Sequence, residues 1–261
     1  MCGDATCLDI IVRLLAIGLS SGAMIALNAI GVTLVYGHVR QINFAHGDLF
    51  ALTTALIAWG IESQKITAAS SPLSILTTLA WVAGAAALWG ALINAAVERL
   101  AFRPFRGVSR VAPLIATIGI SFILYQCALF LRYLTNAVIP YEHRSQPGIP
   151  ELPRLRIPEL LPQDNLIALL GLPLRARVPI ADLLMPLAAL GMALLVTLLL
   201  RGTRTGRALR ASSQDAEAAA LCGVNTDRVP TLAFALGGVL AAAAALLFTL
   251  YYTPTMAHRA G

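Results

Sequence analysis

The amino-acid sequence predicts an all-α membrane protein: a polytopic bundle of about six transmembrane helices in a single domain, residues 1–261. Hydrophobic residues make up 58% of the chain and charged residues only 12%, whereas soluble domains carry about 25% charged residues. The apolar residues also gather in blocks of roughly 20, the length of helix that crosses a bilayer core of about 30 Å. These two observations exclude an ordinary soluble fold.

Six apolar blocks are long enough to be spans. In chain order they cover about residues 10–36, 44–61, 73–97, 111–133, 180–200 and 229–252. Prolines and polar residues separate them, and several glycines and alanines inside the blocks allow helices to pack closely.

Arginines predict the orientation of the spans. They are dense between the third and fourth spans and between the fifth and sixth (Arg99, Arg103, Arg106 and Arg110; Arg201, Arg204, Arg207, Arg210 and Arg228). Cytoplasmic loops carry an excess of basic residues, so we expect a cytoplasmic loop at about 201–228. The proline-rich loop at about 134–179 is then external, as is the N-terminus. That loop is either an ordered cap or a docking surface for an external partner.

Several function classes are disfavoured. The net charge of +6 comes from arginines at span ends without interleaved aromatic residues, so we expect no nucleic-acid partner. The stretch "GTRTGRAL" lacks the glycine-lysine pattern of a phosphate-binding loop, and the four cysteines fit no zinc spacing. We therefore expect no catalytic residue, no metal and no cofactor. Acidic residues near mid-membrane are typical of ion-coupled carriers, but Asp48 and Asp182 lie near span ends and the other acids are expected in loops.

The stretch "INFAHGD", residues 42–48, places polar groups at the mouth of the second span. One interpretation is a self-satisfied turn in which Asn43 caps the helix and His46 is hydrogen-bonded locally. The other is that Asn43, His46, Gly47 and Asp48 line the path of a polar solute, because irregular polar backbone at membrane depth survives only inside protein or along a wet cavity. Gly47 is expected to permit that irregular backbone.

The stretch "EAAALCG", residues 217–223, predicts a short helix between the fifth and sixth spans. Ser212, Ser213 and Asp215 are candidate N-caps, and Gly223 stands where a C-cap belongs. Its alanines leave no bulky side chains on the surface, so another protein could approach the helix backbone closely. It is either an ordinary surface helix or one held by another protein, with Ala219 and Gly223 on the contact face.

Three stretches together resemble one family. They are "YGHVRQINFAHGD", "RPFRGVSRVAPLIATIGIS" and "GRALRASSQDAEAAALCGVNTDRV", and the third contains the E-A-A-x-x-x-G signature of ATP-binding-cassette importer permeases. The sequence is similar to the LivH-type permeases of branched-chain amino-acid transporters. The resemblance implies that a cytoplasmic coupling segment docks into the ATPase, with these candidate residues: Arg207, Arg210, Asp215, Glu217, Ala218, Ala219, Gly223 and Asp227.

The resemblance also implies location and partners. We expect a multi-pass protein of a bacterial inner membrane, surrounded by lipid. It would pair with a second, LivM-like permease, two ATPase subunits (LivG- and LivF-like) and a periplasmic binding protein. The substrate would be a branched-chain amino acid, with urea or a short-chain amide as the alternative. Members of the family continue past the sixth span, so the chain is expected to be truncated at its C-terminus and to be either a permease or a non-transporting remnant.

Overall fold

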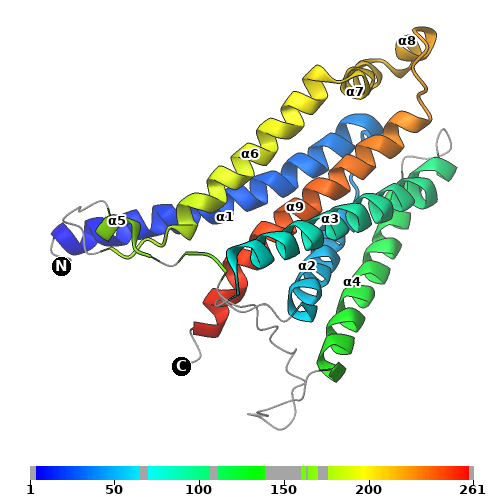
Figure 1. Ribbon diagram of the computed structural model, residues 1–261. Helices are drawn as coiled ribbons and strands as arrows, with labels where there is room; N and C mark the ends of the chain where they lie inside the picture. Colours follow the sequence, from blue (N-terminus) through cyan, green and yellow to red (C-terminus); the bar gives the residue numbers. More distant parts are fainter. Residues whose placement is uncertain are drawn as a thin grey trace.

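One helix, α9 (Arg228–His258), runs through the centre of the molecule (Figure 1). The computed structural model describes residues 4–64, 70–105, 111–138, 160–162, 164–169 and 176–258. In the most apolar stretch of α9, 56% of the residues are buried, whereas the corresponding share in the other candidate spans is 11–17%. Most of the surface of the other spans is therefore left for lipid or another subunit, and α9 forms the core.

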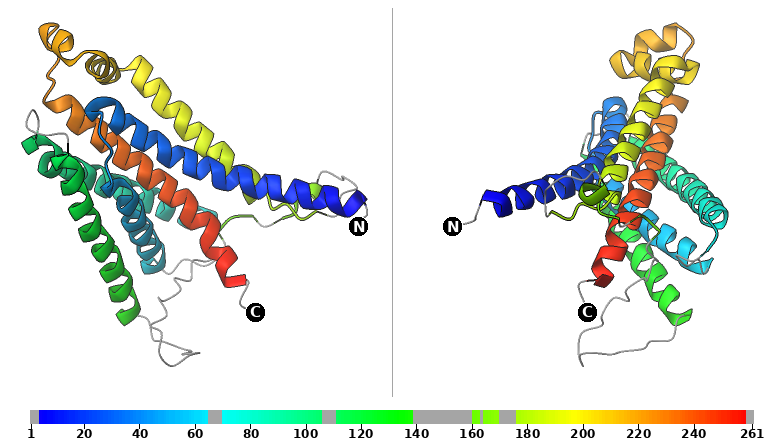
Figure 2. Two further views of the ribbon diagram at one scale, coloured as in Figure 1. Left: turned by 180° about the vertical axis from the view of Figure 1, so that it is seen from behind. Right: turned by 60° about the vertical axis from the view of Figure 1, so that its left-hand side comes forward.

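The remaining long helices surround α9 in two groups. Helices α1 (Asp4–Val39) and α6 (Ala181–Gly202) pack against each other, and α1 also lies along α9. Helices α2 (Ala45–Ser63) and α4 (Ala112–Val138) form a second pair, and α3 (Pro72–Val97) crosses α9 between these groups (Figures 1 and 2). The predicted helical bundle is confirmed.

Five helices of the described chain are long and apolar enough to cross a membrane, not six as expected. The exception is α2, because polar residues at its start (His46 and Asp48) and at its end (Glu62) shorten its apolar stretch. Three helices (α3, α4 and α9) contact α2, and nearly half of its residues are buried. A helix that is shielded from lipid in this way does not need the uniform apolar surface of a span.

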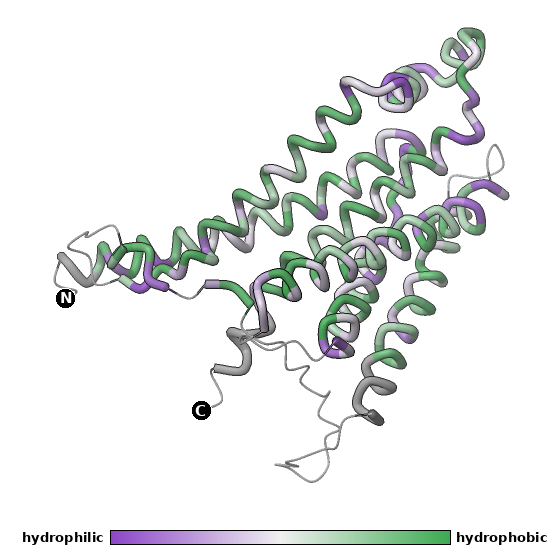
Figure 3. The backbone as a smooth tube through the Cα atoms, in the orientation of Figure 1, coloured by the Kyte–Doolittle hydropathy of each residue, from purple (hydrophilic) through white to green (hydrophobic). Residues whose placement is uncertain are grey.

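The helix ends that carry the arginines gather at one end of the bundle. The last turns of α1 and α6, the start of α9 and two short helices, α7 (Arg204–Gln214) and α8 (Ala216–Leu221), lie there (Figure 1). Hydrophilic colour marks α7 and the start of α9 at this end, and hydrophobic colour dominates the middle of the long helices (Figure 3). The continuation of α3 also reaches this end, through a π-helical turn at Glu98–Phe102 and a 3-10 turn at Arg103–Phe105.

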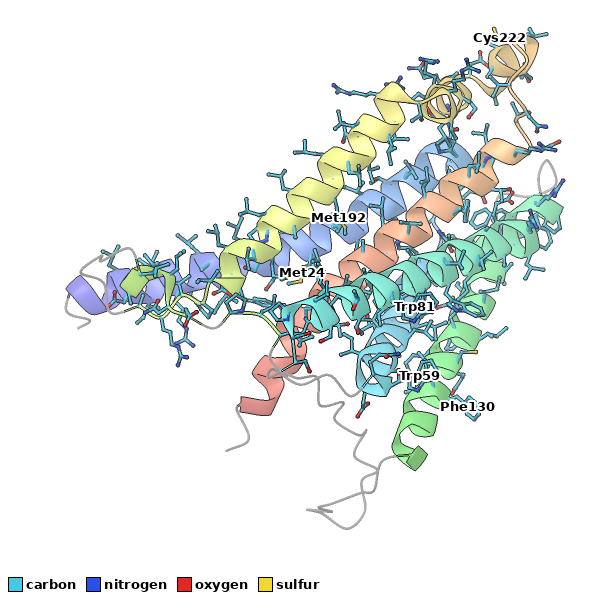
Figure 4. The ribbon with its side chains drawn as sticks, in the orientation of Figure 1. Met24, Trp59, Trp81, Phe130, Met192 and Cys222 are labelled. Carbon is cyan, nitrogen blue, oxygen red and sulfur yellow. The ribbon has the colours of Figure 1, made fainter. Side chains whose placement is uncertain are left out.

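A polar cluster ties three helices together toward the opposite end. The Tyr251 hydroxyl donates a 2.7 Å hydrogen bond to Asp182 Oδ1, and Ser20 Oγ donates a 2.7 Å bond to the Asp182 carbonyl. These contacts join α9, α6 and α1, and Met24 and Met192 lie nearer the middle of the same seam (Figure 4). The short helix α5 (Leu166–Leu169) packs beside α1. Residues 139–159, 163 and 170–175 of the expected external loop lie outside the described residues.

Glycines let α9 approach its neighbours at backbone distance. A Cβ added to Gly31 of α1 would lie 3.0 Å from the Gly237 carbonyl oxygen, and one added to Gly90 of α3 would lie 2.5 Å from the Gly238 carbonyl oxygen. Such contacts replace side-chain interdigitation by direct backbone packing, as is common between membrane helices. They place the interior polar groups of three helices next to one another.

Candidate functional site

The chain between α1 and α2, residues 40–44, is not helical; we call it the break. Arg40 has φ +50° and is the one non-glycine residue with positive φ in the described chain. This left-handed conformation reverses the chain direction as it leaves α1. The Asn43 side-chain oxygen then accepts a 3.1 Å hydrogen bond from the Ala45 amide. The N-cap of α2 is Phe44, without a side-chain cap hydrogen bond, so the expected capping by Asn43 is wrong. Asn43 instead closes a local turn just before the helix.

The break brings the start of α2 into the interior of the bundle. His46 packs against Gly31, where an added Cβ would lie 3.3 Å from the imidazole ring. Gly31 stands eight residues before the end of α1 at Val39, about 12 Å along the axis at 1.5 Å per residue. Helix α2 therefore begins well inside the bundle, and the chain runs back along α1 to reach that point (Figure 2).

His46 is buried without the local hydrogen bond that the turn interpretation requires. Its side chain is 2% exposed, and neither ring nitrogen has a hydrogen-bond partner among the described residues. The Asn28 carbonyl lies near the ring but outside hydrogen-bond geometry, and the Asn28 side-chain oxygen is also unpartnered. Unpaired polar atoms at this depth carry a desolvation cost, so each of them needs an explanation in the packing or in the function.

Gly47 and Asp48 occupy the more open side of the first turn of α2. Gly47 is helical, without positive φ, and an added Cβ would meet nothing within 4 Å. The expectation that Gly47 supplies irregular backbone is therefore wrong, because the irregular segment ends before it. Asp48 accepts a hydrogen bond from Ser121 of α4. Within this turn Asn43 and His46 face the protein, whereas Gly47 faces open space.

The structure adds two interior residues that sequence patterns missed. Asn94 and Glu98 are 1% and 0% exposed. Asn94 donates a 2.6 Å bond to the Phe234 carbonyl and accepts a 3.3 Å bond from Asn43, while Glu98 accepts a 2.8 Å bond from Thr231. The expectation that Glu98 lies in a loop is wrong, because the helical backbone continues through it as a π turn. Its spacing of four from Asn94 places both on one helix face, but this is a signal only once the helix is known to continue through Glu98.

The predicted short helix is confirmed as α8. Asp215 is its N-cap, accepting hydrogen bonds of 2.9 and 3.0 Å from the amides of Glu217 and Ala218. Gly223 follows its C-terminus with φ +81°, and the amides of Gly223 and Val224 bond to the carbonyls of the last turn. Ser212 and Ser213 belong to α7 and do not cap α8.

The expectation that Ala219 and Gly223 share one contact face of α8 is wrong. Ala219 is only 4% exposed and is covered by this chain, whereas Gly223 is exposed. The two residues therefore do not form a common contact face, because Ala219 packs inward. Every other residue of α8 is exposed, and Leu221 is 90% exposed. Cys222 marks the end of α8, far from the bundle (Figure 4).

Helices α7 and α8 form a projecting unit that we call the arm, residues 204–223. Arg207 and Arg210 on α7 are exposed, as are Glu217 and, beyond the arm, Asp227. Leu209 is buried against Val229 and Ala233 of α9, and His38 of α1 is 3.0 Å from the Leu209 carbonyl. The arm is thus anchored by α7 and presents charged side chains outward. Among the described residues no group of three or more His, Cys, Asp or Glu side chains could hold a metal.

Comparison with known proteins places these features in a family. Residues 14–258 match the family model described as the permease component of the branched-chain amino acid transport system. The chain is 32% identical over 240 residues to the high-affinity branched-chain amino acid transport system permease protein LivH of Salmonella typhimurium and of Escherichia coli K12. It is 31% identical to the corresponding BraD protein of Pseudomonas aeruginosa. These matches cover 90% of this chain and 69% of each relative. No solved structure is significantly similar to it.

Proposed function

Because this chain belongs to the family of permease components of the branched-chain amino acid transport system, we propose that it is a membrane subunit of an ATP-binding-cassette importer that takes up branched-chain amino acids. The observation that carries the proposal is the identity of 32% over 90% of the chain to proteins named for that transport. The expected alternative of urea or a short amide has no such support.

The charge distribution supports an inner-membrane location with the arm in the cytoplasm. Arginines concentrate at the end of the bundle where the arm lies, which is the pattern of cytoplasmic loops. The relatives are bacterial proteins. This chain is thus a multi-pass protein whose arm is accessible to soluble cytoplasmic subunits.

The arm is the proposed contact with the ATPase subunits. Its α8 is closed at both ends by local hydrogen bonds, at Asp215 and at Gly223, and Ala219 packs it against this chain. Exposed Arg207, Arg210, Glu217 and Asp227 supply charges for a partner, and Ala218 leaves the backbone approachable. In this proposal the partner subunits hydrolyse ATP, so this chain does not need the phosphate-binding loop that "GTRTGRAL" lacks. A periplasmic binding protein would deliver the substrate to the opposite end.

The open side of the α2 start is the proposed part of the translocation path. Gly47 borders open space, Asp48 is half-buried, and the buried Asn43 and His46 stand behind them. An amino acid carries an ammonium and a carboxylate. The Asp48 carboxylate offers a partner for the ammonium, and the positive end of the α2 dipole favours the carboxylate. A second permease would complete the path by facing this side.

Uptake in a strain without its own system tests the proposal. The chain is expressed with its second permease, two ATPase subunits and binding protein, and uptake of labelled leucine and of labelled urea is measured. We expect saturable leucine uptake that depends on the binding protein. Urea uptake without leucine uptake would refute the assigned substrate, and uptake of neither solute by a correctly assembled complex would refute the transport function.

A further inference from the structure

Asn94 holds two segments that come from distant parts of the sequence. The Asn94 side-chain nitrogen donates a 2.6 Å hydrogen bond to the Phe234 carbonyl of α9. The Asn94 side-chain oxygen accepts a 3.3 Å hydrogen bond from the side-chain nitrogen of Asn43 in the break. With 1% of its side chain exposed, both bonds are shielded from water and lipid. Removing this side chain would leave the buried side-chain nitrogen of Asn43 without this acceptor and take away the second hydrogen bond to the helical Phe234 carbonyl.

Glu98 continues the same arrangement one turn further along. Its carboxylate is fully buried and accepts a 2.8 Å bond from the Thr231 hydroxyl in the first turn of α9. Gly90, Asn94 and Glu98 are spaced by four and face α9 as one stripe. A buried carboxylate is costly, and apolar side chains of similar volume often pack as stably. The hydrogen-bonded pair of Glu98 and Thr231 therefore fixes the position of α3 relative to α9, which an apolar pair would not do.

The segments joined by this stripe lie between the two proposed functional regions. Helix α9 starts at Arg228, only a few residues after the arm ends, so any displacement of the arm reaches its first turns. The break leads directly into the proposed translocation path, and its residues lack the hydrogen-bond ladder of a helix. Its left-handed Arg40 makes it a point where the chain can change direction.

We propose that Asn94 and Glu98 form a clamp that makes the break move together with the cytoplasmic end of α9. The clamp residues position other groups and do not contact the substrate. The inference rests on the proposed function, in which the ATPase acts on the arm. Glu98 and Thr231 hold α9 to α3, and Asn94 extends that grip to Asn43. Movement of the arm then changes the geometry of the α2 start.

Distance measurements between spin labels test the clamp directly. Labels are placed by Phe44→Cys in the break and Leu232→Cys on α9, which are 46% and 42% exposed, in a full complex whose native cysteines are serine. In the wild type we expect the distance between these two labels to stay the same with and without bound ATP. In Asn94→Leu the distance should differ between the two states.

Coupling of ATP hydrolysis to substrate provides a second readout. In Asn94→Leu the stimulation by loaded binding protein should fall about fivefold or more, the lower range of coupling between sites. Glu98→Leu should behave in the same way, whereas Glu98→Gln keeps an oxygen for Thr231 and should retain the wild-type stimulation. Thr53→Val is the matched control, because this buried hydroxyl bonds only to carbonyls of its own helix.

The label-distance test of the clamp can fail or succeed independently of the uptake test of the proposed function. An Asn94→Leu complex whose label distance matches the wild type in both states would overturn the clamp. If that variant does not assemble, Thr231→Val removes one hydroxyl at a half-buried position and is judged by the same distance criterion. The label distances need no substrate, so a complex that keeps them coupled yet takes up no leucine would contradict the proposed function and leave the clamp intact.

Discussion

The tightest contact in the bundle gives a quantitative test of its packing. In Gly90→Ala the new Cβ would lie 2.5 Å from the Gly238 carbonyl oxygen and 3.4 Å from the Ala242 methyl group. Ordinary contact with the carbonyl begins at 3.4 Å, so α3 and α9 must separate by about 0.9 Å, the difference of the two distances. The obstacle is backbone on both sides, and no side chain can rotate away.

The expected cost follows from a matched pair of variants on one helix. Gly84 also lies within α3, but an added Cβ there meets nothing within 4 Å. Both Gly→Ala changes gain the same helix propensity, about 1 kcal/mol, and only Gly90→Ala pays the overpacking cost of about 1–3 kcal/mol. The difference in unfolding free energy between the two variants should therefore be about 1–3 kcal/mol.

Reversible unfolding in mixed micelles measures that difference. Each purified variant is titrated with denaturing detergent, and helix content is followed by circular dichroism to obtain the free energy of unfolding. Gly84→Ala should match or exceed the wild type, and Gly90→Ala should be the less stable variant. Equal stability of the two variants would refute the close backbone contact between α3 and α9.

Two further predictions concern the arm and the start of α2. Gly223→Ala should destabilise the end of α8 by about 1 kcal/mol, because alanine must adopt the left-handed conformation, and Glu217→Lys puts a cation at the positive end of that helix. Both variants should reach the membrane yet lose stimulation of ATP hydrolysis by loaded binding protein, and normal stimulation in both would contradict the coupling role. Asp48→Asn keeps an acceptor for Ser121 but loses the charge, so we expect a raised KM for leucine uptake with normal assembly. Ser121→Ala is its control, because it removes the hydrogen bond and keeps the charge, and an unchanged KM in Asp48→Asn would exclude Asp48 from substrate binding.

Local patterns were sufficient where a structure depends on nearby residues. The long apolar blocks predicted the main helices because helix formation in a membrane satisfies the backbone within each segment. Helix α8 was predictable for the same reason, since Asp215 and Gly223 close its two ends by local hydrogen bonds. Two of the three stretches that resemble the family cover the break and the arm.

Features that depend on distant pairs were not predictable. Glu98 follows an apolar block and precedes several arginines, so composition indicated a loop, whereas Thr231 from α9 supplies its buried partner. The second expected span, α2, does not meet the apolarity of a span because of its polar residues, and the helices that shield it from lipid come from distant parts of the sequence. Asn94 lies within an apolar run and shows its role only when the break and α9 are placed beside it.

The interior start of α2 explains why these features occur together. On its buried side, a helix that begins inside a bundle has first-turn amides that neither water nor lipid can satisfy, so protein groups must bond to them. Asn43 bonds to the Ala45 amide, and Asn94 in turn holds Asn43 in place. Asn94 reaches both Asn43 and the Phe234 carbonyl only because α3 and α9 meet at backbone distance through Gly90 and its partner glycine. The glycine contacts, the buried amides and the polar character of α2 are therefore consequences of one requirement, which is a helix start held inside the membrane domain.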